Sequence, residues 1–285
     1  MTLYPTRFVA SLVERERHVA PEARSLFWRL AAGDAYAETR AWLEGFVASR
    51  PQGEQARLVS RLRDRRSFLP ALIEAATGAA LVRSGFAVAH EPQVAGRRPD
   101  FYVAGPQAMG ALIVEVTTVV ATGQAGSGRD DQVVPVSARQ LWTHIRHKAA
   151  SYAPLAEGSD LALVVVAGTG PGELCAADFF SYLRTPRPRA GGVVLESMRP
   201  ELSALGLVDA FAPIPRLHLV ANPAARRPVP EALLGMSGAQ HGEAASSAPG
   251  ADLGAFGSVG FHLADGERLG AEPIVSLGSD PGSKS

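Results

Sequence analysis

The chain has 285 residues, of which 46% are hydrophobic, so it is long and apolar enough to bury a large core. Its 28 basic and 28 acidic side chains cancel, which excludes a globally basic nucleic-acid-binding protein but leaves room for a local basic groove. Cys175 is the single cysteine, which excludes a disulfide framework and a cysteine-based zinc site and fits a reducing cytoplasm.

Residues 1–66 predict a helical N-terminal region. The opening stretch carries charges where a secretory signal would be apolar, and the longest apolar run of the chain, 161–168, is too short to span a bilayer. We therefore expect a cytoplasmic protein without a membrane partner. Apolar residues recur at helical spacing, which predicts three or four helices broken near Pro21, Gly33 and 51–53.

Residues 67–222 predict an α/β domain. A firm helix over 67–86 has its apolar positions on one face and ends at a serine–glycine pair. Strands are expected next over 86–92, 98–104 and 110–120, followed by a mobile loop over 122–136, a helix over 137–155, a strand over 160–168, a short helix over 176–184 and a strand over 216–222. This order predicts a mixed central sheet flanked by helices.

Residues 223–285 predict a flexible C-terminal region. The stretch 236–254 is rich in glycine, alanine and serine and has no periodicity, and 270–285 is typical of a disordered tail. Between them, 256–263 could form an edge strand.

Two acidic residues, Asp100 and Glu115, lie on neighbouring predicted strands joined by a short turn. Neighbouring strands lie about 4.8 Å apart, so both carboxylates could enter one pocket. Carboxylates among apolar residues are costly unless they are paired or bind a metal, and Mg²⁺ suits a site with one or two of them. Glu74 interrupts an otherwise apolar helix and could reach the same pocket.

Lysine is rare in this chain: 26 of the 28 basic residues are arginine, and Lys148 and Lys284 are the two lysines. Lys148 shares one face of its predicted helix with Gln140, His144 and Tyr152, which are spaced by four. A lysine retained where arginine is the rule indicates a site that needs a compact ammonium.

Each of these residues also fits a structural role when it is taken alone. Asp100 could end a strand, Glu115 could pair with an arginine, and Glu74 and Lys148 could face solvent. Their order and spacing together favour a common site.

The run from Ala71 to Thr118, with Pro99–Asp100 on one strand and Glu115 on the next, resembles the core of the PD-(D/E)XK nuclease superfamily, which has the restriction-endonuclease-like fold. The resemblance covers roughly residues 67–168 and matches Glu74 to the family's helix glutamate. Thr117 stands where that family has a lysine. Some members move the lysine to a neighbouring helix, where this chain has Lys148. The "PDF", "EVT", "K…Y" and "ANPAARRPVP" segments also resemble an uncharacterised branch of the superfamily.

The resemblance implies a hydrolase acting on nucleic-acid phosphodiesters, with DNA favoured over RNA. It implies that Asp100, Glu115 and the Val116 carbonyl hold Mg²⁺ or Mn²⁺ and that Glu74 steers a second ion or a water. Lys148 would stabilise the phosphorane or orient the attacking water. The side chains expected to hold the nucleic-acid backbone are Arg97, Arg98, Arg129, Arg139 and Arg146.

Two other interpretations remain open. The chain could be a catalytically silent module that keeps the fold and binds nucleic acid or a protein, or an unrelated α/β enzyme for a phosphorylated small molecule with a closed pocket. A Lys148 ammonium that points into the pocket of Asp100 and Glu115 would favour the nuclease; one that faces solvent would favour the module. The sequence leaves a homodimer open.

Overall fold

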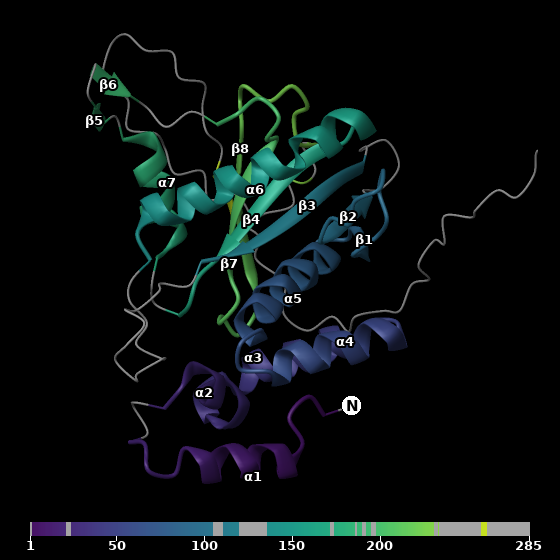
Figure 1. Ribbon diagram of the computed structural model, residues 1–285, viewed down its shortest axis with the longest axis vertical. Helices are drawn as coiled ribbons and strands as arrows, with labels where there is room; N and C mark the ends of the chain where they lie inside the picture. Colours follow the sequence, from purple (N-terminus) through teal and green to yellow (C-terminus); the bar gives the residue numbers. More distant parts are fainter. Residues whose placement is uncertain are drawn as a thin grey trace, which may run out of the picture.

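The computed structural model describes residues 2–20, 24–104, 111–119, 136–171, 174–185, 187–189, 192–194, 198–230, 233 and 258–260. Within them the fold is α/β: a mixed sheet flanked by helices (Figure 1). This arrangement confirms the predicted α/β class with a mixed sheet and flanking helices. None of the described helices is both long and apolar enough to cross a membrane.

The sheet has the strand order β1-β2-β3-β4-β7-β8-β9. Its strands are β1 (Ala87–His90), β2 (Phe101–Ala104), β3 (Ala111–Thr118), β4 (Ala162–Gly168), β7 (Ala204–Asp209), β8 (Arg216–Ala221) and β9 (Ser258–Gly260). The central strands β3, β4 and β7 are parallel, and the outer pairs are antiparallel. A separate small sheet pairs β5 (Arg187–Arg189) with β6 (Gly192–Val194).

Helices cover both faces of this sheet. On one face lies α5 (Phe68–Arg83), and on the other lie α6 (Ala138–Ser159) and α7 (Ala176–Arg184) (Figure 1). The reason is visible in β3, whose side chains alternate between two apolar clusters. Leu112, Val114 and Val116 pack in the cluster of α5, whereas Ile113 packs in the cluster of α6. A parallel strand buried on both faces reads as a continuous apolar run, as predicted for this segment.

The N-terminal helices extend the layer on the α5 side. They are α1 (Thr6–Arg15), α2 (Leu26–Ala32), the short 3-10 helix η2 (Asp34–Tyr36), α3 (Ala37–Ala48) and α4 (Gln52–Arg63). Leu30, Leu43 and Leu62 from this region belong to the same apolar cluster as the residues of α5 and β2. α5 is therefore apolar on nearly every side, because it lies between the sheet and the N-terminal helices.

The close contact between α5 and the sheet requires a glycine. A Cβ atom at Gly168, the last residue of β4, would collide with Ile73 of α5. The predicted boundary at residue 66 falls between two helices, α4 and α5, and the apolar core continues across it.

The predicted elements agree with the structure in type and order, and the main differences are added strands and one longer helix. The strands β5 and β6 and the mostly buried strand β7 had not been expected. α6 includes Pro154 and continues beyond its expected end at residue 155 to Ser159, where Asp160 caps it in the left-handed conformation. The expected edge strand is present as β9, whereas the predicted mobile loop and the C-terminal stretches 236–254 and 270–285 fall outside the described residues, apart from Val136.

Candidate functional site

Asp100 and Glu115 lie together where β2 and β3 separate. The strand pairing ends at Phe101 and Val114. Beyond it the side chains continue the pairing: the Val116 N–H donates to Oδ2 of Asp100 at 2.7 Å, and the Asp100 N–H donates to Oε1 of Glu115 at 3.2 Å. Both carboxylates lie on the α6 face of the sheet, because the residues that flank them, Phe101, Val114 and Val116, pack toward α5. The predicted carboxylate pair is therefore formed.

The environment of Glu115 disfavours its charged form. Its side chain is completely buried, and Oε2 accepts no aligned hydrogen bond. Burial and, next in size, the charge of Asp100 raise the pKa of Glu115 to about 8, and Lys148 offsets only part of this. A buried carboxylate in this state gains from a nearby cation.

Lys148 supplies a cation from α6. This helix begins with a capping box between Ser137 and Gln140, and it packs its apolar face on β3 and β4, which fixes Lys148 beside the end of β2. Nζ of Lys148 lies 2.9 Å from Oε2 of Glu115 and 3.6 Å from Oδ2 of Asp100. Burial alone would lower the pKa of Lys148, but the charges of Asp100 and Glu115 outweigh it and raise the pKa above its ordinary value. The predicted position of Lys148, pointing into the pocket, is what the structure has.

Tyr152 lies one helical turn after Lys148 and connects α6 to the loop that precedes Asp100. Its ring centroid is 5.3 Å from Nζ of Lys148 and 5.8 Å from the Arg97 guanidinium, and its hydroxyl donates to the Arg98 carbonyl at 3.3 Å. Arg97 also donates to the Ser151 carbonyl. Burial, and then the charge of Glu115, raise the pKa of Tyr152. The loop before Asp100 is thus held against the helix that carries Lys148.

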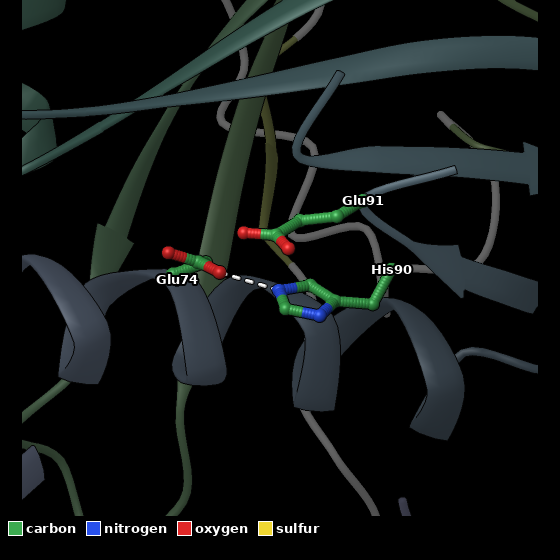
Figure 2. Close-up of side chains that lie close together, drawn as sticks. All are labelled: Glu74, His90 and Glu91. Carbon is green, nitrogen blue, oxygen red and sulfur yellow. Dashed lines mark hydrogen bonds and ion pairs between the residues drawn. The ribbon is translucent and has the colours of Figure 1, made fainter. Parts of the chain in front are cut away.

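Glu74 lies on the opposite face of the sheet, with α5. Figure 2 shows its carboxylate directed to the His90 imidazole, with Glu91 beside them. Arg61 of α4 forms a bidentate pair with the same carboxylate, at 3.1 and 2.6 Å. Burial would raise the pKa of Glu74, but His90 and Arg61 outweigh it and hold the pKa below its ordinary value. The expected reach of Glu74 into the pocket is not observed, because these two partners hold it behind the sheet.

The cluster of Glu74, His90 and Glu91 has donor atoms within 4.8 Å of one another, a spacing that could hold a metal ion. Each carboxylate already has an arginine partner, however. Arg61 neutralises Glu74, and Arg57 lies 2.7 Å from Glu91. This cluster is therefore better described as a structural link between α4, α5 and the end of β1. Burial would lower the pKa of Arg61, but Glu74 and, to a smaller extent, Glu91 and Asp100 outweigh it and raise this pKa above its ordinary value.

No protein-family model, curated protein or solved structure matches this chain. The site must therefore be judged by its own chemistry.

The five predicted arginines fall into three groups. Arg97 and Arg98 are exposed in the turn before Asp100. Arg139 and Arg146 are exposed on α6, but at 100° per residue they face about 180° and 160° away from Lys148. Arg129 lies outside the described residues.

Sequence reasoning did not connect Arg61 and His90 with Glu74. The signal was weak: Arg61 sits in an arginine-rich helix typical of a solvated face, and His90 ends a short strand. Only the packing of α4 and β1 against α5 brings them to that carboxylate.

The carboxylate pair offers oxygen atoms of the kind that bind a divalent cation. Asp100 and Glu115 supply two carboxylates, and Oε2 of Glu115, which is buried and has no aligned hydrogen bond, faces the Lys148 ammonium. In a strand the N–H and C=O of one residue point to the same side, and the Val116 N–H points to Asp100. The Val116 carbonyl is therefore directed to the same gap, where β2 no longer pairs. Two carboxylates and a carbonyl form an all-oxygen set that suits Mg²⁺ or Mn²⁺.

Proposed function

We propose that this protein is a metal-dependent nuclease of the PD-(D/E)XK type, which hydrolyses phosphodiester bonds of nucleic acid, with DNA favoured, and has its lysine on α6. The observation that carries the proposal is the contact of 2.9 Å between Nζ of Lys148 and Oε2 of Glu115. Thr117 occupies the position where the family has a lysine, and it carries no charge. Lys148 places an ammonium beside Glu115 from a different element, α6. The sheet and flanking helices are compatible with a restriction-endonuclease-like core.

Asp100, Glu115 and the Val116 carbonyl would hold the metal. When bound, Mg²⁺ or Mn²⁺ supplies a water of lowered pKa and neutralises phosphate oxygens. The Lys148 ammonium would stabilise the negative charge that develops on the phosphoryl group, or orient the attacking water. Tyr152 and Arg97 would keep Lys148 and the loop before Asp100 in register, and Arg98 would contact the substrate backbone at the mouth of the pocket.

The proposal is tested with plasmid, single-stranded DNA and RNA substrates in the presence of Mg²⁺ or Mn²⁺. The variants are Asp100→Asn, Glu115→Gln and Lys148→Met. Lys284→Met and Glu157→Gln are the matched controls, since Lys284 is the other lysine and Glu157 is an exposed carboxylate on α6. We expect each site variant to lose at least about 100-fold in cleavage rate, as when one preorganised charge is removed from an active site.

Cleavage by the site variants at the rate of the controls would refute the assigned residues. If the wild-type protein cuts none of the substrates with either metal, the proposed activity is wrong.

A further inference from the structure

A concave surface lies beside α6, away from the carboxylate pair. It is lined by Thr143, Arg146, His147, Ala150 and Arg199. The first four come from α6, and Arg199 comes from the segment that leads into β7. We call this surface the α6–Arg199 groove. Its described lining residues include two arginines and a histidine and no carboxylate.

The groove and the pocket of Lys148 lie on opposite sides of the same helix. Arg146 is two residues from Lys148, which turns it about 160° around the helix axis. The sheet order agrees: Lys148 leans toward Asp100 at the end of β2, whereas Arg199 precedes β7, which lies beyond β4. A ligand in the groove therefore does not compete for the pocket.

The arginines of the groove differ from those of a neighbouring concavity. There, Arg226 pairs with Glu157 and Glu201, and Arg227 pairs with Asp160. Within the described part of the chain, no ion pair neutralises the side chain of Arg146 or Arg199, and both are exposed. The groove thus carries positive charge that none of its described lining residues neutralises.

Secondary structure and hydrogen bonds hold the backbone under these side chains. Arg146 stands on a long helix next to the buried Ile145. The Arg199 carbonyl accepts a hydrogen bond of 2.8 Å from the amide of buried Asn222 and one of 3.0 Å from the Leu202 N–H. A fixed spacing of cations reduces the ordering that a ligand must induce on binding.

The spacing of the charges indicates a polymer rather than a single phosphate. Arg139 shares the exposed side of α6 with Arg146 and lies seven residues earlier, which places it about 10.5 Å along the helix axis. Successive phosphates of a strand can contact arginines spaced along a helix in this way, whereas a single phosphate would contact both only if the two long side chains converged on it.

We propose that the α6–Arg199 groove, continued by Arg139, binds the phosphodiester backbone of a nucleic acid strand at a place separate from the Asp100–Glu115–Lys148 pocket. The inference rests on the proposed function, since it assigns a second contact for the same class of substrate. It requires no base contact, so binding by the groove should be independent of sequence and sensitive to salt.

The test is binding without cleavage. Fluorescence anisotropy of labelled single-stranded and duplex DNA is measured in EDTA with the full-length protein, the double variant Arg146→Glu/Arg199→Glu, and the matched control Arg7→Glu/Arg216→Glu. The control changes the net charge equally at exposed arginines of α1 and β8. We expect at least about a tenfold loss of affinity in the groove variant and none in the control. The slope of the logarithm of the binding constant against the logarithm of the salt concentration should become shallower by roughly 0.7 to 0.9 for each lost phosphate contact.

Equal losses in the groove and control variants would overturn the proposal, because net charge would then explain both. Inorganic pyrophosphate or a mononucleotide that binds as tightly as the strand, and less tightly to the groove variant, would overturn the polymeric ligand. The two hypotheses can fail separately: absence of cleavage with intact groove binding refutes only the nuclease, and cleavage with binding unaffected by Arg146→Glu/Arg199→Glu refutes only the groove.

Discussion

Nζ of Lys148 lies 2.9 Å from Oε2 of Glu115, a carboxylate whose side chain has no exposed surface. Thr117, two residues after Glu115 on the same face of β3, carries no charge that could do the same. The ammonium is instead supplied by α6, and the side chain of Lys148 remains 29% exposed, so it lies at the border between the core and solvent. A ligand can therefore reach the Lys148 ammonium, although the Glu115 carboxylate that it contacts is buried.

Replacement of Lys148 by Met should destabilise the protein by about 2 to 4 kcal/mol at pH 8, because it leaves the buried Glu115 next to Asp100 without a cation. Urea unfolding followed by circular dichroism measures this difference. Lys284→Met serves as the control and should be neutral. The double variant Lys148→Met/Glu115→Gln should recover most of the loss; a double variant as unstable as Lys148→Met would show that packing, not charge, explains the effect.

The stability contributed by Glu115 should depend on pH in a defined direction. Its pKa is raised from 4.5 to about 8 in the folded protein, so between these values the folded state binds more protons than the unfolded state. This contribution is fully present below pH 4.5 and is lost as the pH rises toward 8, at no more than about 1.4 kcal/mol per pH unit. Glu115→Gln cannot titrate and should gain stability relative to wild type over this interval.

Urea unfolding of wild type and Glu115→Gln at several pH values between 5 and 8 measures the difference, with Glu157→Gln as the exposed control. The groups that face Glu115 are Asp100, Lys148 and Tyr152. A constant difference between the two proteins across the interval would mean that Glu115 is ionised throughout.

Binding of Mn²⁺ should release protons. A metal ligand must be deprotonated, and the raised pKa of Glu115 means that most of this carboxyl is protonated at pH 7. Isothermal titration calorimetry in buffers of different ionisation enthalpy should therefore show nearly one proton released at pH 7 and fewer above pH 8. Asp100→Asn should abolish binding of the ion, whereas Glu91→Gln, in the neighbouring cluster, should leave it unchanged. Binding lost only in Glu91→Gln would move the metal site to that cluster.

Arg61→Met should cost roughly 2 kcal/mol of unfolding free energy, because hydrogen bonds to charged partners are worth about 1.5 to 3 kcal/mol and Glu74 is buried. Arg57→Met is the matched control: its pair with Glu91 is exposed, and such pairs contribute less than about 1 kcal/mol. Thermal unfolding of both variants compares them directly. Equal effects would indicate that Glu74 is not held mainly by Arg61.

The amino-acid sequence by itself determined the class of the fold and the central pair of acids. Continuous apolar runs at β3 and β4 require burial on both faces, and the amphipathic pattern of α6 requires one face against the sheet, so the α/β layers follow from local periodicity. Asp100 and Glu115 were predictable as neighbours because a short connection between adjacent strands leaves little freedom of register. The rarity of lysine singled out Lys148 before its position was known.

The tertiary structure alone decided what these groups contact. The sequence pattern grouped Glu74 with Asp100 and Glu115, but Glu74 lies on the opposite face of the sheet. There Arg61 of α4 and His90 at the end of β1 contact its carboxylate. Arg146 is two residues from Lys148 yet faces the opposite side of α6, where the segment before β7 adds Arg199. Such assignments depend on which distant elements pack together, and a one-dimensional pattern of polar and apolar residues does not encode the partner of a polar side chain.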